Sequence, residues 1–531
     1  MKETSPDNES LSPRTRDASS KPPKQRKLPQ GESAQLKEDR FVLDEESDQP
    51  IVVRDGKTDY KAKGLAGGQS NQSTNATERK APTKSVSSSL IALNRKAEKE
   101  PECRFRDLYR LLSLQALYES FGSLKRNAAP GVDGVTWQDY EANLDENLEG
   151  LLARLKEKRY RAPHVKRSYI PKGGGRMRPL GLPTLEDKIV QHAASRILES
   201  IYEADFSDRS RGYRRGQLGA RESSQELSLD LNTGRYRWVV EADIRSFFEE
   251  VDHDWLTKML EQRIDDRAFM RLIRKWLKAG VLDPLVNPNQ AENSEAGTPQ
   301  GGIVSPMLAN IYLHYVLDLW IEKVVKKRCQ GAVIFMRYAD DIIVGFEKQS
   351  DAEHYLEQLP KRLEKFNLQL AEEKSSLVKF HRWEPETSGR FTFLGYDFYW
   401  SPTKKNPKNR VVKRKTNKKK LRASLRAMKD WIKESRSWPL KMILSSLRRR
   451  LRGYWNYYCV IANHNMTSRY MKAVSELMFK WLNRRSQRKS YTWSEFNRHW
   501  KGDWQIPRPQ VVEKWVNQRD SQSEIPLVWT P

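Results

Sequence analysis

The chain has 531 residues, and its 96 Lys and Arg against 69 Asp and Glu give a formal net charge of +27. Such an excess of positive charge favours a polyanionic binding partner, and nucleic acid is the first candidate. No run approaches the roughly 18 consecutive apolar residues of a membrane span and no signal-peptide core follows Met1, so we expect a soluble, intracellular protein of the cytoplasm with no membrane partner. The three cysteines are scattered, which excludes a clustered zinc module of the nuclease type.

The first part of the chain, residues 1–90, is predicted to be a disordered extension, because it is rich in polar residues and has almost no apolar periodicity. The pattern changes at Ile91. A helical stretch is expected from Phe105 to about residue 125, and a second amphipathic helix from about residue 139 to residue 158. The folded protein should therefore begin near residue 91.

Strands and helices alternate over residues 165–350. The pattern predicts strands near 167–171, 237–244 and 333–346, and helices near 186–203, 252–280 and 306–326. Strands interleaved with helices in this way indicate an α+β domain in which helices pack on a sheet.

Two adjacent carboxylates, Asp340 and Asp341, follow the apolar run 333–336 and precede the apolar run 342–346. Because side chains alternate faces along a strand, the pattern predicts a hairpin with both acids at its tip. A solvated Asp-Asp turn would give the same local sequence. Converging carboxylates, however, are the oxygen ligands that Mg²⁺ uses together with phosphates.

A third carboxylate, Asp243, ends the apolar strand 236–244. Alone it would be read as a helix cap or turn residue. It lies 97 residues (340 − 243) before Asp340, so only the tertiary fold can bring the acids together. Three carboxylates on two strands can hold two Mg²⁺ ions, one activating a hydroxyl and the other stabilising pyrophosphate, which is nucleotidyl transfer.

The chain beyond residue 396 becomes strongly basic. We expect a basic linker over residues 397–420, a separate helical domain over residues 421–500, and a short tail over residues 501–531 with no endonuclease domain. Aromatic residues of the helical domain, such as Tyr454, are more typical of a core than of base stacking, so its cations carry the prediction of RNA binding. These are Arg448, Arg449, Arg450, Arg452, Arg484, Arg485, Arg488 and Lys489.

The motifs 243–248, 297–306 and 338–341 resemble, in order and spacing, those of group II intron-encoded reverse transcriptases. Further segments resemble other motifs of the same family. The helical domain is similar to the maturase, or thumb, domain of that family. These segments are 169–172 with 178–183, 372–374 and 393–395, and, in the helical domain, 451–458 with 481–493.

The resemblance implies a right-hand polymerase, with fingers and an antiparallel palm sheet over residues 91–396 and a helical thumb after it. It implies that Asp243, Asp340 and Asp341 hold two Mg²⁺ ions, and that Lys374 is a candidate proton donor to pyrophosphate. A surface lysine is the alternative for Lys374.

The resemblance also implies a deoxynucleotide site. Lys172 and Arg178 would grip the triphosphate, Gln300 would contact the nucleotide, and Phe248 would occupy the space of a ribose 2′-hydroxyl. The alternatives are a solvated basic hairpin, a structural turn amide and an ordinary core phenylalanine, respectively.

One segment departs from the family pattern. The family shows a Phe-Arg-Pro-Gly-Arg-Ser-like run where this chain has Tyr213-Arg214-Arg215-Gly216-Gln217. Arg214 and Gly216 are retained, and Arg214 is expected to touch template and primer. The loss of Pro and Ser puts the grip on the template in question, but not the metal site.

The sequence thus predicts an RNA-directed DNA polymerase that uses dNTPs, an RNA template and a DNA primer or target DNA. As a maturase it would also bind structured intron RNA, supporting splicing and mobility, in a nucleoid- or ribonucleoprotein-associated setting. Two alternatives stay open, a host-adopted reverse transcriptase in phage defence and a splicing maturase with a vestigial polymerase. The intact carboxylates argue against the latter.

Overall fold

The computed structural model describes residues 86–513 apart from 174–175, 284, 286–290, 293–296, 298–300, 385, 404, 486–487 and 489. The side chains of residues 86, 171–173, 176, 291 and 292 also lie outside the description. Most of the predicted N-terminal extension is therefore outside the described residues. Its last residues differ from the prediction, because helix α1 begins at Val86 and runs to Lys99.

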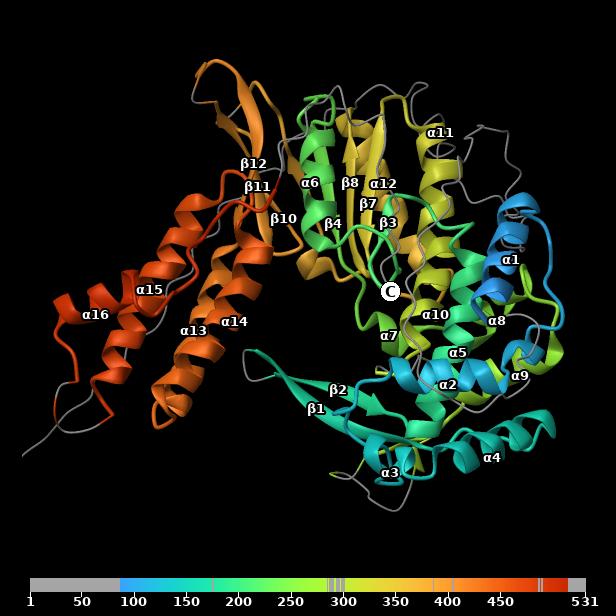
Figure 1. The fold of residues 1–531 in the computed structure, drawn as a ribbon. Coiled ribbons are helices and arrows are strands. Elements are labelled where there is room, and N and C mark those ends of the chain that lie inside the picture. Colours follow the sequence, from blue (N-terminus) through green and yellow to red (C-terminus); the bar gives the residue numbers. More distant parts are fainter. Residues whose placement is uncertain are drawn as a thin grey trace, which may run out of the picture. The chain divides into compact units, whose positions relative to one another are not determined.

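The region before the main sheet consists of helices and a long hairpin (Figure 1). The predicted helix after Phe105 is shorter than expected, because α2 begins only after Ser113, whose side chain accepts a hydrogen bond from the Ala116 N–H. The hairpin pairs β1 with β2 in antiparallel register. The elements are α1, the 3₁₀ turn Tyr109–Leu111, α2 (Leu114–Ser123), α3 (Trp137–Glu141), α4 (Leu144–Lys156), β1 (Val165–Gly173), β2 (Arg176–Leu182) and α5 (Leu185–Tyr202).

A five-stranded sheet in the order β3-β7-β8-β4-β9 forms the centre of the α+β region. Strands β7, β8, β4 and β9 pair antiparallel, and the short β3 pairs parallel with β7. The predicted strands near 237–244 and 333–346 are confirmed. The strands are β3 (Ser210–Arg211), β4 (Trp238–Ala242), β7 (Val333–Tyr338), β8 (Asp341–Phe346) and β9 (Ser376–Lys379).

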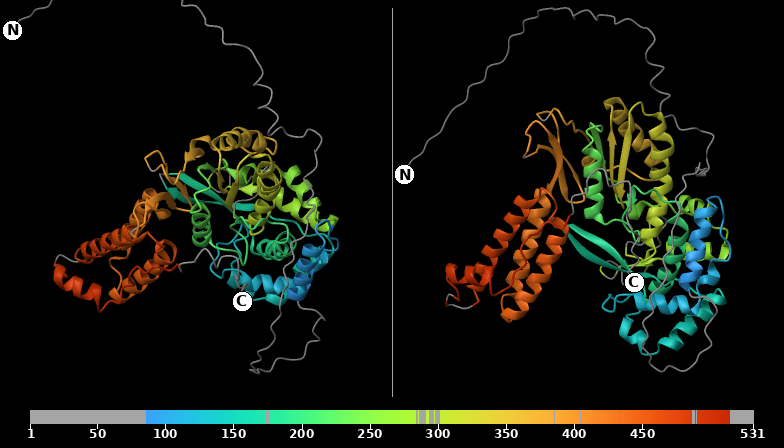
Figure 2. Two further views of the ribbon diagram at one scale, coloured as in Figure 1. Left: turned by 90° about the horizontal axis from the view of Figure 1, so that it is seen from above. Right: turned by 45° about the horizontal axis from the view of Figure 1, so that its top comes forward.

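Helices pack beside this sheet (Figures 1 and 2). In the view of Figure 1, further helices lie below the sheet, toward the β1–β2 hairpin. The predicted helix 252–280 is two helices, because Asp266 caps a new helix start by accepting hydrogen bonds from two backbone N–H groups. The elements are α6 (Ala220–Leu231), α7 (Phe247–Glu250), α8 (His253–Glu261), α9 (Arg267–Leu277), β5 (Val281–Leu282), β6 (Ala291–Glu292), α10 (Ser305–Leu313), the π turns His314–Asp318 and Ile321–Val325, α11 (Lys326–Arg328), α12 (Gln349–Glu364) and the 3₁₀ turn Glu372–Lys374.

The central strands are covered on both faces, which explains their nearly continuous apolar sequence. On one face Met336 and Ile343 join a core that includes residues of α6 and of a second sheet. On the other face Arg337 meets Asp318, which lies in the helical segment after α10. A strand that is buried on both faces is apolar along its length, except at positions such as Arg337 where a buried polar side chain has a hydrogen-bond partner.

The predicted basic linker over residues 397–420 is wrong. Most of it is strand: β11 (Tyr396–Pro402) pairs antiparallel with β10 (Phe391–Phe393) and with β12 (Arg410–Thr416). Along β12 buried residues alternate with less buried ones, and Val412, Arg414 and Thr416 are the buried set. The period of two is concealed in the sequence because one inward position is itself a cation, Arg414, with a lysine on each side.

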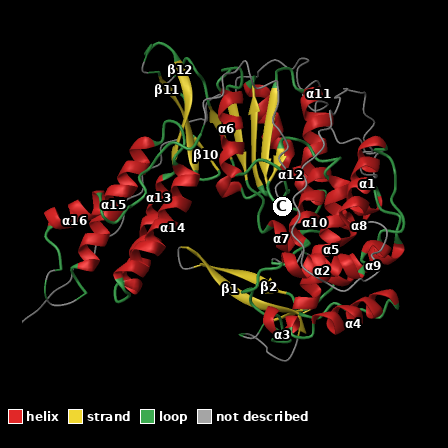
Figure 3. Ribbon diagram, viewed as in Figure 1, coloured by secondary structure: helices red, strands yellow, loops and turns green. Residues whose placement is uncertain are grey.

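The C-terminal region is helical, as predicted (Figure 3). Its core includes Trp431, Leu447 and Val474, one from each of three long helices, and the contacts between α13 and α15 are extensive. The helices are α13 (Lys418–Ser435), α14 (Leu440–Tyr458), α15 (His464–Leu482) and α16 (Trp493–Lys501). No helix in the part of the chain that the structure describes is long and apolar enough to cross a membrane.

The predicted tail differs from the structure up to residue 513. Trp504 and Ile506 are buried in the helical core, and the Pro507 carbonyl accepts a hydrogen bond from Trp455 Nε1 at 2.9 Å. Glu513 forms a buried ion pair with Arg414 of β12 at 2.7 Å. Residues 502–513 are therefore part of the folded C-terminal region.

Candidate active site and nucleic-acid interface

The two adjacent carboxylates lie at the end of a tight hairpin, as predicted. Strand β7 ends at Tyr338, β8 begins at Asp341, and these two residues face each other in the ladder. Ala339 takes a left-handed backbone conformation (φ 56°), which turns the chain within two residues. Its N–H donates to the Arg211 carbonyl at 2.9 Å, so the turn is held from a second segment.

Asp243 is delivered to the same end of the sheet by the neighbouring strand. Strand β4 pairs antiparallel with β8, and its last residue, Ala242, faces Ile342. Asp243 follows immediately and so lies beside Asp341, across 98 residues of sequence (341 − 243). Lys374 Nζ forms an ion pair with the Asp243 carboxylate. The structure thus brings together all four residues predicted to be catalytic.

The three carboxylates affect one another electrostatically. Desolvation, together with Asp340 and Asp243, raises the pKa of Asp341 to about 6, although this residue is exposed at the end of the hairpin. Withdrawal from solvent also raises the pKa of Asp340, with Asp243 adding to it. Their excess negative charge favours a bound cation.

The donor set suits a hard divalent cation, since carboxylate oxygens are its preferred ligands. Neither Asp340 nor Asp341 has an ion-pair partner among the described residues, and only Asp243 is neutralised, by Lys374. Over the same residues, no three His, Cys, Asp or Glu side chains are already closed around one metal position. The residues therefore fit a site completed partly by oxygens of a substrate, as Mg²⁺ sites commonly are.

A cavity of about 410 Å³ adjoins the carboxylates. Three residues predicted for the site line it, namely Asp340, Arg178 of β2 and Phe248 of α7. Its remaining lining residues are Leu180, Tyr213, Gly301, Gly302, Ser305 and Pro306. The Lys172 side chain and Gln300, also predicted to contact the nucleotide, lie outside the described residues.

Tyr213 was not predicted as a site residue. It lies in the left-handed region (φ 57°), is 54% exposed, and meets Phe248 edge to face with ring centroids 6.4 Å apart. Partial burial raises the pKa of its hydroxyl, and Asp340 adds to the effect. The available signal was its place in the loop that departs from the family pattern, directly beside the retained Arg214.

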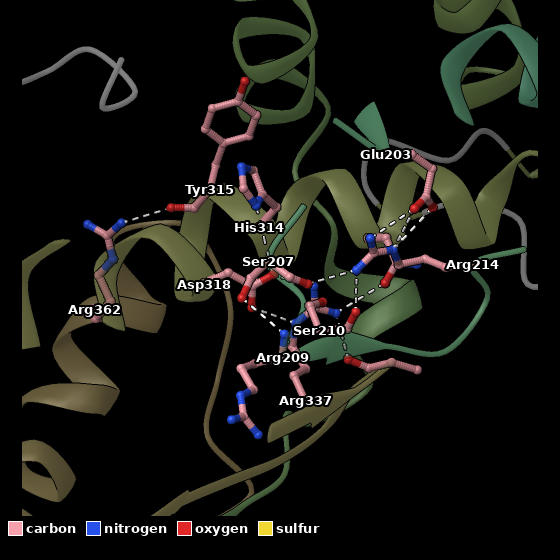
Figure 4. Close-up of polar contacts among 12 residues, drawn as sticks. Glu203, Ser207, Arg209, Ser210, Arg214, His314, Tyr315, Asp318, Arg337 and Arg362 are labelled. Atoms are coloured by element: carbon pink, nitrogen blue, oxygen red, sulfur yellow. Dashed lines mark hydrogen bonds and ion pairs between the residues drawn. The ribbon is translucent and has the colours of Figure 1, made fainter. Parts of the chain in front are cut away.

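A buried polar network supports the hairpin turn from below (Figure 4). The Arg337 guanidinium donates to Asp318 at 2.8 and 2.6 Å, and both side chains are 1% exposed. Its third nitrogen donates to the Ala339 carbonyl and to Asn310 Oδ1, at 3.0 and 3.1 Å. Asn310 in turn donates to the Gly212 carbonyl at 2.9 Å. One network therefore fixes both the carboxylate turn and the residue before Tyr213.

Arg214 does not lie where the sequence predicted. Its side chain is 1% exposed; it binds both Glu203 oxygens and donates to the carbonyls of Ser207 and Ser210 (Figure 4). Four of its five N–H donors are engaged in this way, and the buried side chain does not reach the surface where a phosphate would bind. The expected contact with template and primer is therefore corrected to a structural role in the loop that carries Tyr213.

The cations predicted in the C-terminal region fall into two groups. Arg449 and Arg452 are exposed on α14, and neither side chain is paired within the described part of the chain. Four others have partners: Arg448 donates to the Trp504 carbonyl, Arg450 and Arg484 lie over Trp431 and Trp481, and Arg485 donates to the Trp438 carbonyl. Arg488 is exposed and engaged within the chain, and Lys489 lies outside the described residues.

The fold and the site define a class of protein. A family model described as reverse transcriptase (RNA-dependent DNA polymerase) matches residues 170–398, which include the central sheet, the three carboxylates and the residues that line the cavity. A second model, described as the group II intron maturase-specific domain, matches residues 418–500, from the start of α13 into the last turn of α16. The chain thus carries a reverse transcriptase domain followed by a maturase-specific domain.

Individual proteins are also similar to this chain over part of its length. Protein YkfC of Escherichia coli K12 is 33% identical over 290 residues, which cover 48% of this chain and 75% of that protein. The group II intron-encoded protein LtrA of Lactococcus lactis subsp. cremoris is 38% identical over 221 residues, 40% of this chain and 36% of LtrA. The chain belongs to the group II intron-encoded reverse transcriptase and maturase family. The match nevertheless spans well under two thirds of LtrA.

Proposed function

We propose that this protein extends a DNA primer on an RNA template, with Asp243, Asp340 and Asp341 as the ligands of two Mg²⁺ ions. The observation that supports this most strongly is the meeting of these carboxylates, from β4 and the β7–β8 turn, beside a cavity of about 410 Å³. When bound, such ions activate the primer hydroxyl and stabilise the charge on the leaving pyrophosphate.

Lys374 has a definite role in this proposal. In the structure its ammonium group neutralises Asp243. The same ammonium group lies at the carboxylate end of the sheet, where it would be able to donate a proton to the leaving pyrophosphate. A Lys374→Arg variant keeps the ion pair but makes a poor proton donor, because a guanidinium holds its proton at any working pH.

The cavity beside the carboxylates is proposed to hold the deoxynucleotide. Arg178, which lines the cavity, would pair with the triphosphate together with Lys172, and Gln300 is assigned to the same nucleotide. The Phe248 ring occupies the wall next to Asp340 and would clash with a ribose 2′-hydroxyl. A Phe248→Ala variant should therefore incorporate ribonucleotides more readily than the parent protein.

The C-terminal region is proposed to bind structured intron RNA and so to support splicing and mobility of that intron. This assignment is supported by the maturase-specific match at residues 418–500 and by the exposed cations of α14. In a right-hand polymerase, residues 91–396 would correspond to the fingers and palm, and the C-terminal helices would correspond to the thumb. We expect the protein to act in the cytoplasm as a ribonucleoprotein.

The test is primer extension on an RNA template with purified protein. The parent protein should make cDNA only when Mg²⁺ is present, and Asp340→Ala should lose this activity. Retained full activity in Asp340→Ala would refute the carboxylate assignment. A gel-shift assay with the intron RNA tests the maturase assignment separately, because the same variant should bind RNA as the parent does.

A further inference from the structure

The loop that forms one wall of the cavity needs an acceptor from outside itself. Gly301 and Gly302 line the cavity, and so do Ser305 and Pro306 at the start of α10. Between them the Ile303 and Val304 N–H groups precede the helix, so the helix cannot satisfy them. Val304, at the helix start, has an apolar side chain and provides no capping hydrogen bond.

A single side chain from another helix supplies this acceptor. Gln191 of α5 accepts from the Ile303 N–H at 2.8 Å and from the Val304 N–H at 3.4 Å, both through Oε1. Its side chain lies in a nearly closed setting, at 3% exposure. The two anchored N–H groups lie in the middle of the segment whose flanks line the cavity.

Gln191 is itself held in one orientation. Its Nε2 donates to Asp187 Oδ2 at 2.9 Å, one turn earlier in α5. The other oxygen of Asp187 accepts from Trp276 Nε1 of α9 at 2.7 Å and from the Tyr160 hydroxyl. The amide is therefore fixed with its carbonyl toward the loop, because only its NH₂ can donate to Asp187.

The loop is also clamped from its other side. Gly301 has φ 117°, and a Cβ there would lie 2.3 Å from the Gly181 carbonyl oxygen of β2. The wall is thus pressed against β2 on one side and hydrogen-bonded to α5 on the other. Small displacements of either support would change the shape of the cavity.

We infer that Gln191 is a positioning residue for the nucleotide, which holds the Gly301–Pro306 wall in the shape that receives the incoming dNTP. This inference rests on the proposed polymerase function and deepens it. Gln191 touches no reacting group. Its effect should therefore appear in the KM for dNTP and not in the turnover rate at saturation.

The primary test replaces the amide by an apolar side chain of similar size. Gln191→Leu leaves two buried N–H groups without an acceptor and should raise the KM for dNTP roughly tenfold, with kcat changed less than about twofold. Gln115→Leu, on the surface helix α2, is the matched control and should match the parent protein. A purely structural role would lower the active fraction, and thus kcat, without changing KM, and would overturn the inference.

A double variant provides the rescue. In Asp187→Asn combined with Gln191→Glu, the donor and acceptor roles are exchanged. The amide introduced on the first turn of α5 would donate to the introduced carboxylate, whose oxygens still accept from the Ile303 and Val304 N–H groups. The KM should return to within about threefold of the parent value. Failure of this rescue, with a folded protein, would contradict the hydrogen-bond mechanism.

A third measurement does not depend on polymerase activity. Hydrogen exchange of the Ile303 and Val304 amides should accelerate in Gln191→Leu, by about tenfold or more, while the amides of β7 keep their protection. Unchanged exchange would overturn the inference even if cDNA synthesis were intact. Absence of cDNA synthesis in the parent protein would instead refute the proposed function.

Discussion

The carboxylate end of the central sheet and the C-terminal helical region handle charge in opposite ways. At the sheet, two cations are each paired with one carboxylate: Arg337 with Asp318, and Lys374 with Asp243. On α14, Arg449 and Arg452 project from the surface and pair with no side chain among the described residues. Chemistry on one phosphorus atom requires exact placement, whereas binding a long polyanion requires mainly the number of cations.

The largest expected effect is the loss of polymerisation when a carboxylate is replaced that contributes to catalysis but not to the stability of the fold. Asp341→Asn removes a proposed metal ligand, and polymerisation should fall about 10³-fold or more in a primer-extension assay. Because neighbouring acids and withdrawal from solvent raise the pKa of Asp341 to about 6, its charge is unfavourable in the folded protein. The variant should therefore unfold at the same or a higher temperature, and a marked loss of stability would contradict this reading.

The second prediction concerns a charge that serves stability. Arg337→Met leaves the buried Asp318 carboxylate unpaired and should lower the free energy of unfolding by about 3–5 kcal/mol, measured by chemical denaturation. The double variant Arg337→Met/Asp318→Leu removes both charges and should recover a large part of that loss. If the single variant were as stable as the parent, the network below the hairpin turn would not be the support that we describe.

A smaller effect should follow from Glu241, which lies on β4 below the site. Burial, with Asp341 and Asp397 adding to it, raises its pKa from 4.5 to about 7. The folded state thus disfavours the ionised form, and this residue's contribution to stability declines as pH rises from about 4.5 to 7. Glu241→Gln should be more stable than the parent by about 1–2 kcal/mol at pH 8, allowing for partial screening, and equal to it below pH 4.5.

Thermal unfolding at a series of pH values measures this difference. Glu249→Gln is the matched control, since Glu249 is exposed on the neighbouring helix α7. A constant difference between Glu241→Gln and the parent across the whole pH range would exclude ionisation as its cause.

The smallest single effects belong to the surface cations. Arg449→Ala and Arg452→Ala should each weaken RNA binding by a few-fold, and each should reduce the slope of log affinity against log salt by about one. Filter binding over a salt series measures both quantities. If one of these variants abolished binding at low salt, these cations would be individually placed, as at the carboxylate site, and the contrast between the two regions would fail.

Local sequence was a reliable guide where one strand or turn carries its own signal. The hairpin around Asp340 and Asp341 was predicted because two apolar runs flank a short polar turn. The sequence failed at β12, where the buried Arg414 lies between two lysines, and at the tail, where Glu513 finds a partner 99 residues away. In each case the deciding partner lies elsewhere in the chain.

By itself the sequence determined the chemical class, because the motif residues must be acids, cations and an aromatic ring in a fixed order along the chain. It also placed Arg178 and Phe248 in the site, on the strength of resemblance. The tertiary structure decided the supports. Burial turned Arg214 from an expected RNA contact into a loop anchor, and packing of α5 against the loop gave Gln191 its place. These roles depend on which groups a buried donor or acceptor can reach, and only the folded chain fixes that distance.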